Sequence, residues 1–146
     1  MDFDFLQQGA MLAPMAGVTD MPFRVICHEM GCPMAVSEMV SAKGYLLSPK
    51  GNRAAQELLS VDESEKGAVA LQLFGHEPDV MARAAEELTA DGRYALLDIN
   101  MGCPVPKIVG NGEGSALMKE PVRAAELISA VAKASHVPVT VKMRLG

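Results

Sequence analysis

The chain has 146 residues, of which 49% are hydrophobic and only 4% aromatic, so length and composition suit one globular domain. Its formal net charge is −5, which gives none of the basic footprint of a free-standing nucleic-acid-binding protein. Residues 1–9 hold two aspartates and no basic stretch, and every apolar run is short, so we expect neither a signal peptide nor a membrane span.

Three cysteines, Cys27, Cys32 and Cys103, form an odd set without a C-x-x-C pair. This pattern argues against a disulfide framework and favours a reducing compartment. The three histidines show no metal-ligand spacing. We therefore expect a soluble cytoplasmic protein without a metal site.

Apolar runs in chain order predict five buried strands. They lie at residues 11–15, 33–37, 68–74, 94–99 and 137–143. Short continuous apolar runs bounded by glycine, proline or charged residues are typical of strands buried on both faces, which occur in parallel sheets covered by helices.

Helix signals lie between these strands. Thr19 or Asp20 is a suitable N-cap for a helix that Gly31 ends, and its apolar positions, which include Cys27, are expected to face the core. Further helices are predicted at 52–59, 77–90 and 121–134. The intervening segments are predicted as a loop at 41–51, a charged turn at 62–66 and a mobile loop at 110–114.

The repeated strand–helix order predicts an α/β fold with a parallel sheet. The dinucleotide fingerprint G-x-G-x-x-G is absent after the first strand, which weakens a doubly wound dinucleotide-binding fold. A (β/α)8 TIM barrel needs eight strands and about 250 residues. We therefore interpret residues 1–146 as the N-terminal part of a TIM-barrel catalytic domain, containing about the first five strands.

The strongest candidate for chemistry is Cys103, which follows the strand at 94–99 on a turn shaped by Gly102 and Pro104. Catalytic groups collect at the carboxyl ends of parallel strands. A thiol with an ordinary pKa of about 8.5 is mostly protonated at neutral pH, so it can act as a general acid. The alternative is that Cys103 is a small buried hydrophobic residue.

Polar side chains at other strand ends extend this candidate site. Gln72 interrupts an apolar strand, so it either pairs with a neighbouring strand or binds a heterocycle above the barrel. Asn100 ends its strand, and Lys142 and Arg144 face the same side of theirs. A buried Lys142 needs an anionic partner, for which Asp98 is one candidate; otherwise it lies at an exposed strand end.

The sequence resembles the tRNA-dihydrouridine synthases. The motifs that carry the resemblance, in the family's order, are APMAGVTD at 13–20, PFR at 22–24, LQLFG at 71–75, NMGCP at 100–104 and VKMRLG at 141–146. The resemblance implies a TIM barrel that is followed by a helical RNA-binding domain, which we expect to be absent from these residues. It also implies reduction of the C5=C6 bond of particular uridines in tRNA by FMN, with NADPH as the reductant.

The same resemblance implies roles for individual residues. Pro14, Met15 and Ala16 would line the flavin ring, and Gln72 and Lys142 would bind its polar edge. Asn100 and Arg144 would contact the uracil, and Cys103 would protonate C5 after hydride transfer to C6. The target base must then leave its stack to reach the barrel mouth. The groups that bind the FMN phosphate are expected after strands seven and eight, beyond residue 146.

Two other functions stay open from the sequence. A flavin-dependent dehydrogenase of a free pyrimidine also places a small acid or base opposite the flavin, although the motifs at 13–17 and 100–104 favour the tRNA enzyme. A truncated, non-catalytic barrel that serves as a binding module is the third possibility. Retention of flavin and turnover of tRNA against free uracil would separate them.

Overall fold

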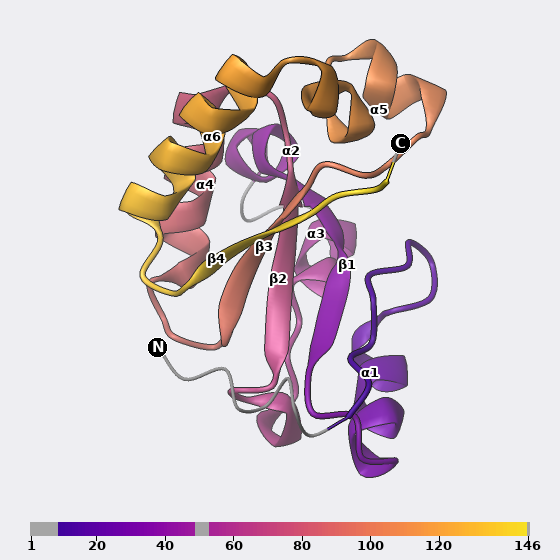
Figure 1. Ribbon diagram of the computed structural model, residues 1–146. Coiled ribbons are helices and arrows are strands. Elements are labelled where there is room, and N and C mark those ends of the chain that lie inside the picture. The colour runs from indigo at the N-terminus through magenta and orange to yellow at the C-terminus, as the bar shows by residue number, and fades with distance from the viewer. Residues whose placement is uncertain (1–8, 49–52, 146) are drawn as a thin grey trace.

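Four parallel strands form one sheet in the order in which they occur along the chain (Figure 1). They are β1 (Ala35–Ser41), β2 (Val69–Phe74), β3 (Leu96–Asn100) and β4 (Val139–Lys142). The computed structural model describes residues 9–48 and 53–145. The order β1-β2-β3-β4 is that of successive strands in a TIM barrel and lacks the reversal of strand order in a doubly wound sheet. The predicted α/β class is confirmed.

Two long helices cover one face of the sheet, α4 (Pro78–Thr89) and α6 (Pro121–Ala134) (Figure 1). Each begins with a proline, whose missing N–H would have no partner in a first turn. The odd-numbered residues of β2 and β3 point to these helices, because side chains alternate along a strand. The buried core between the two layers contains Leu71, Leu97 and Ile99.

The even-numbered residues of β2, β3 and β4 point to the opposite face, as does Val36 in the first half of β1. Near the amino ends of the strands they are apolar, and Val36, Ala70 and Leu96 form a small second cluster with Met34. Near the carboxyl ends they are polar. The fold therefore places the chemistry-bearing side chains of several strands on one face, at one end of the sheet.

The shorter helices lie in the connections between strands. They are α1 (Met21–Glu29), α2 (Ala42–Leu47), α3 (Arg53–Leu58), α5 (Pro106–Gly110) and two 3-10 helices, η2 (Glu63–Glu65) and η3 (Gly114–Lys119).

Three connections differ from the prediction. Helix α2 occupies residues predicted as the 41–51 loop, because Ser41 caps it by accepting a hydrogen bond from Gly44 N; residues 49–51 lie outside the described part of the chain. Of the predicted loop at 110–114, only residues 111–113 form a turn, because its first residue ends α5 and its last begins η3. The charged turn at 62–66 forms η2, which Asp62 and Glu65 close with a capping box.

The first predicted strand, 11–15, is reduced to one bridge between Leu12 and Ala35. Leu12 N donates to Met34 O at 3.0 Å, and Val36 N donates to Leu12 O at 3.0 Å. Pro14 has no N–H with which to extend this pairing. The segment therefore lies parallel to β1 at the edge of the sheet but does not form a full strand, whereas the strand predicted at 33–37 continues to Ser41.

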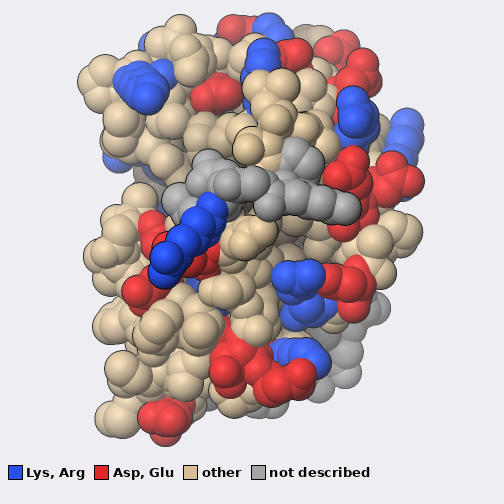
Figure 2. Space-filling view, turned by 180° about the vertical axis from the view of Figure 1, so that it is seen from behind, with Lys and Arg blue, Asp and Glu red and all other residues tan. Residues whose placement is uncertain are grey.

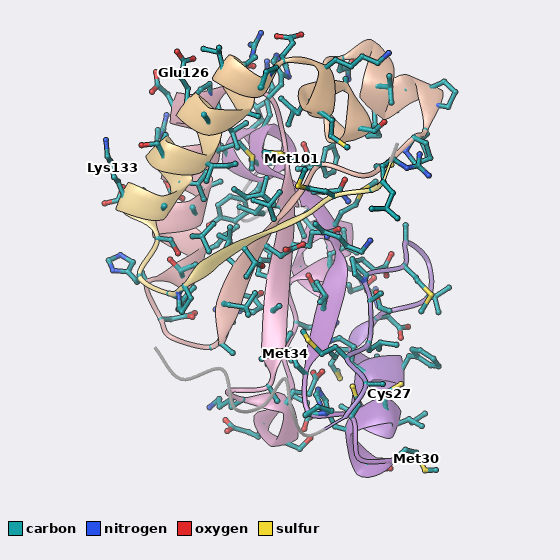
Figure 3. All side chains as sticks on the ribbon, viewed as in Figure 1. Cys27, Met30, Met34, Met101, Glu126 and Lys133 are labelled. Atoms are coloured by element: carbon teal, nitrogen blue, oxygen red, sulfur yellow. The ribbon has the colours of Figure 1, made fainter. Side chains whose placement is uncertain are left out.

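Helix α1 begins as predicted, because the Asp20 side chain accepts a hydrogen bond from Phe23 N. The prediction that its apolar face, with Cys27, belongs to the core is wrong. Ile26 is 56% exposed and Met30 is 84% exposed, and Met30 points away from the sheet (Figure 3). The buried residue of α1 is instead Arg24.

Acidic and basic side chains are interspersed over the face in Figure 2, and neither sign dominates it. Within residues 9–48 and 53–145, no helix has the length and apolar character needed to cross a membrane.

Candidate active site

The strand register brings five polar side chains together at the carboxyl end of the sheet. Gln72 lies beside Asp98, Asp98 beside Thr140, and Asn100 beside Lys142. All five occupy even-numbered positions, so they share the face that α4 and α6 leave uncovered. This is the end of the sheet at which Cys103 follows β3.

A chain of hydrogen bonds links the sheet to the cysteine loop. Asn100 Oδ1 accepts from Gly102 N at 3.2 Å and from Cys103 N at 3.0 Å. Asn100 Nδ2 donates to Gln72 Oε1 at 2.9 Å, and Gln72 Nε2 donates to Asp98 Oδ2 at 2.7 Å. Thr140 Oγ1 donates to Asp98 Oδ1 at 2.7 Å. Gln72 is thus paired with a neighbouring strand, one of the two alternatives that the sequence left open.

Asp98 is the buried acid of this chain of contacts. The pKa of its carboxyl is raised above the ordinary value, because burial is the largest effect. The hydrogen bonds from Gln72 and Thr140 and the nearby Lys142 ammonium act in the opposite direction and lower it. Lys142 therefore acts on Asp98 as a nearby charge. Among the described residues, however, Lys142 forms no ion pair within 4.0 Å, so the expected direct counter-charge contact is not made.

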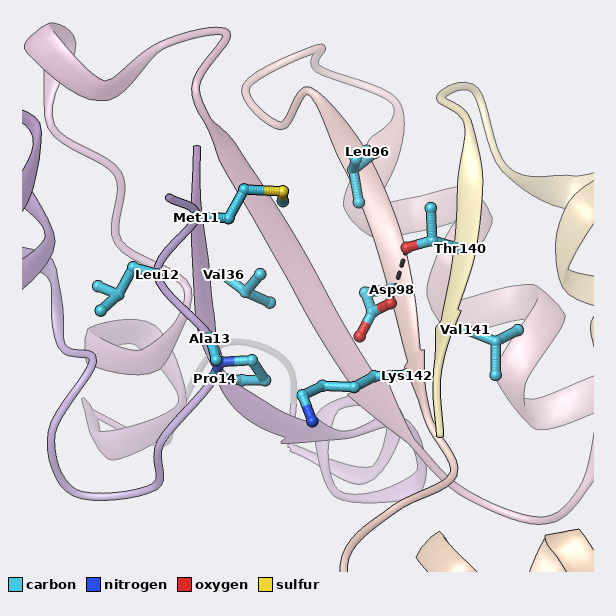
Figure 4. A pocket seen from close by; sticks show the side chains of 10 residues that line it. All are labelled: Met11, Leu12, Ala13, Pro14, Val36, Leu96, Asp98, Thr140, Val141 and Lys142. Atoms are coloured by element: carbon cyan, nitrogen blue, oxygen red, sulfur yellow. Dashed lines mark hydrogen bonds between the residues drawn. The ribbon is translucent and has the colours of Figure 1, made fainter. Parts of the chain in front are cut away.

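Two adjoining cavities lie along this face and share Pro14 and Lys142. The larger, of about 350 Å³, lies between the segment 11–14 and the sheet and is mainly apolar, with Asp98 and Thr140 in its wall. Figure 4 shows Lys142 extending from β4 towards the segment that carries Ala13 and Pro14. The smaller cavity, of about 250 Å³, is lined by the candidate catalytic residue Cys103.

The structure brings most of the predicted site residues together. Its smaller cavity is lined by Pro14, Ala16, Met39, Gln72, Asn100, Gly102, Cys103, Val105 and Lys142. Met15 is 41% exposed and lines neither of these two cavities. Arg144 is exposed beyond the end of β4 and also lines neither.

Sequence reasoning missed the residues that hold the segment around Pro14 and Ala16. The buried Thr19 hydroxyl accepts from Met15 N at 3.1 Å and donates to Met15 O at 3.2 Å. The Glu38 carboxylate accepts a hydrogen bond from Gly17 N and so fastens the segment to β1. A glutamate that interrupts an apolar strand, as Glu38 does, is the signal that could have identified this contact.

The loop after Cys103 closes back on the cysteine. Ser115 N donates to Cys103 O at 3.0 Å. Gly114 has a φ of +60°, and a Cβ at this position would lie 2.7 Å from Cys103 O and 3.1 Å from Cys103 Cβ. Only glycine fits here, since both the backbone conformation and the close approach exclude a side chain. The position of Cys103 is therefore fixed from both sides, by Asn100 and by Gly114.

We expect Gly114→Ala to destabilise the protein more than Gly112→Ala. Gly112 has a φ of +77° and nothing within 4 Å of an added Cβ, so its substitution costs only the left-handed strain of about 1–2 kcal/mol. The clash with Cys103 adds about 1–3 kcal/mol at Gly114. Urea unfolding measures both, and equal losses would contradict the close approach. The Cys103 alkylation rate should change in Gly114→Ala alone.

Within the described part of the chain, no group of three or more His, Cys, Asp and Glu side chains is arranged to hold a metal ion.

Comparison with known proteins identifies the family. Residues 11–146 match the family model described as "Dihydrouridine synthase (Dus)". The chain is 44% identical over 134 residues to tRNA-dihydrouridine synthase B of Pectobacterium carotovorum and 45% identical over 134 residues to that of Yersinia pestis. It is 38% identical over 141 residues to a probable tRNA-dihydrouridine synthase of Rickettsia prowazekii.

These matches cover 92% of the chain for the first two relatives and 97% for the third, but only 40%, 40% and 42% of the relatives themselves. The chain thus spans about two fifths of their length. On the extent of the family match, the chain belongs to the dihydrouridine synthase family.

Proposed function

We propose that the protein is a tRNA-dihydrouridine synthase, which reduces the C5=C6 bond of specific uridines in tRNA with FMN as cofactor and NADPH as reductant. The family match and the names of the relatives support this proposal. The observation that carries it is the position of Cys103, which lines one small cavity together with Gln72, Asn100 and Lys142.

The two cavities fit a flavin in their chemistry. An isoalloxazine ring has an apolar end and an edge of carbonyl and ring-nitrogen acceptors. The larger cavity offers apolar walls, and the smaller one offers the Lys142 ammonium and the Gln72 amide beside Pro14 and Ala16. Lys142 would bind the edge at which reduced flavin carries negative charge. Met15, at the exposed rim, would contact the ring from outside the cavities.

The residues of the chain have separate tasks in this proposal. When bound, reduced FMN supplies the hydride. Cys103 Sγ holds the proton that C5 of the uracil receives. Asn100 Nδ2 also contacts Met39 Sδ at 3.7 Å; a thioether is a weak acceptor, so a uracil carbonyl could replace it. Arg144, beyond β4, would approach the base from the open side.

Titration of the protein that carries this chain with FMN, followed by the shift of the flavin absorbance band, tests the cofactor. We expect saturable binding, and we expect Lys142→Met to weaken it about 10- to 100-fold, because a hydrogen bond to a charged group contributes about 1.5–3 kcal/mol. Lys133→Met is the matched control, since Lys133 is exposed on α6, away from the site (Figure 3). Equal affinity of both variants would contradict the assignment of Lys142.

Substrate choice needs a second measurement. Reduced flavin in the protein should be oxidised by tRNA and not by free uracil. Oxidation by uracil alone would instead identify a dehydrogenase of a free pyrimidine.

A further inference from the structure

We propose that Asp98 is a positioning residue for Cys103, because its carboxylate fixes the orientation of Gln72, whose amide pairs with the Asn100 side chain that holds the cysteine loop. The proposal deepens the proposed function, since the importance of placing Cys103 rests on its role as the proton donor. The geometry itself needs no cofactor.

The orientation of Asn100 follows from the cysteine loop. The backbone N–H groups of Gly102 and Cys103 can only donate, so the side-chain atom that faces them must be the oxygen. The Asn100 nitrogen is thereby directed to Gln72. An Asn100 amide turned by 180° would place its NH2 against two other donors.

Gln72 transmits the same constraint to β2. Because Asn100 presents its nitrogen, Gln72 must present its oxygen, and its own nitrogen then faces away. That nitrogen meets Asp98 Oδ2. An ionised carboxylate can only accept, so Asp98 is the group that matches this orientation and rejects the flipped one.

Burial makes the match energetically important. Gln72 is 1% exposed, Asp98 6% and Asn100 8%, so little of their surface is open to water that could replace a missing partner. A buried donor or acceptor without a partner costs about 1–3 kcal/mol. Without Asp98, Gln72 would lose the acceptor that matches its orientation, and a flipped Gln72 would place its nitrogen against the nitrogen of Asn100 and compete with the orientation that holds the cysteine loop.

Thr140 has a different part in the same cluster. It donates to the other carboxylate oxygen, Oδ1, and so fixes Asp98 against β4. Within the described residues, Thr140 forms no hydrogen bond with the Gln72 or Asn100 amide. Removal of the Thr140 hydroxyl therefore takes away the contact that anchors the carboxylate to β4, but it leaves in place the carboxylate oxygen that orients Gln72.

The test is the rate at which iodoacetamide alkylates Cys103, measured for each cysteine by peptide mass spectrometry. We expect Asp98→Leu, which has no acceptor, to change the Cys103 rate about tenfold, the equivalent of about 1.4 kcal/mol. Cys27 on α1 is the internal reference and should keep its rate. Asp98→Asn retains an oxygen for Gln72 and can donate to Thr140, so it should keep the wild-type rate. Thr140→Val should also keep it, because the carboxylate oxygen that faces Gln72 is unchanged.

Two results would overturn the proposal: an unchanged Cys103 rate in Asp98→Leu, or an Asp98→Asn variant that behaves like Asp98→Leu. If Asp98→Leu does not fold, as judged by circular dichroism, Gln72→Met decides, because it breaks the next bond and should change the Cys103 rate equally. The alkylation assay contains no flavin and is therefore independent of the cofactor. If Asp98→Leu changes the Cys103 rate but the protein does not bind FMN, the proposed function is rejected and the positioning role of Asp98 is kept.

Discussion

Glu65→Leu is expected to lower the free energy of unfolding by about 3–5 kcal/mol, because it leaves a buried arginine without its counter-charge. Arg24 is 1% exposed, and its guanidinium binds both Glu65 oxygens, through Nε at 2.9 Å and Nη2 at 3.2 Å. Two carbonyls, Thr19 O at 3.0 Å and Ser60 O at 2.8 Å, accept further hydrogen bonds from the guanidinium but do not neutralise its charge.

Three variants make this prediction specific. Urea unfolding of Glu63→Leu is the matched control, because Glu63 lies in the same short helix but is exposed in its pair with Lys66; we expect a change within about 0.5 kcal/mol. Arg24→Met combined with Glu65→Leu should recover most of the loss, since neither charge is then buried alone. A Glu65→Leu loss no larger than that of Glu63→Leu would show that the arginine finds other compensation.

This ion pair also connects stability to the site. Arg24 binds the carbonyl of Thr19, and the Thr19 hydroxyl holds both backbone groups of Met15. The segment that lines the cavities with Pro14 and Ala16 is therefore fixed to η2 through Arg24. Loss of Glu65 should loosen that segment as well as the fold.

The sequence predicts the elements better than their contacts. Apolar runs and proline signals place α4, α6, β2, β3 and β4 close to their observed bounds, because these patterns depend on local physics; β1 continues four residues beyond the predicted strand. Helix α2 is not predicted, because it is a single short stretch in a segment rich in glycine and serine. The strand at 11–15 fails because pairing depends on a neighbour, and only Leu12 finds one.

The same distinction applies to the candidate site. Cys103, Gln72 and Asn100 could be predicted from their positions at strand ends. The contact between Gln72 and Asp98 spans 26 residues and that between Thr140 and Asp98 spans 42, and these contacts depend on strand register, which periodicity does not specify. The burial of Arg24 could not be predicted for a related reason. A single charged residue in a helix pattern is expected to face solvent, and its partner Glu65 lies 41 residues away in the sequence.

Cys103→Ala is expected to reduce dihydrouridine formation about 10²- to 10⁴-fold, the range for loss of a positioned general acid. FMN affinity should stay the same, because the groups proposed to bind the flavin are Gln72, Lys142 and the segment around Pro14. The measurement is single-turnover oxidation of reduced flavin by tRNA in the protein that carries this chain. Cys27→Ala is the control, since Cys27 lies on α1 outside both site cavities.

Cys103→Ser separates the shape of the side chain from its acidity. A hydroxyl fills nearly the same space but is a much weaker acid than a thiol, so the serine variant should remain close to the alanine variant in rate. A serine variant with nearly wild-type turnover would mean that Cys103 supports the loop and that another group, or water, delivers the proton. In that case the hydrogen bonds that the loop N–H groups donate to Asn100 and the close approach of Gly114 would position only the backbone. The proton donor would then have to be sought among the other polar groups of the same cavity.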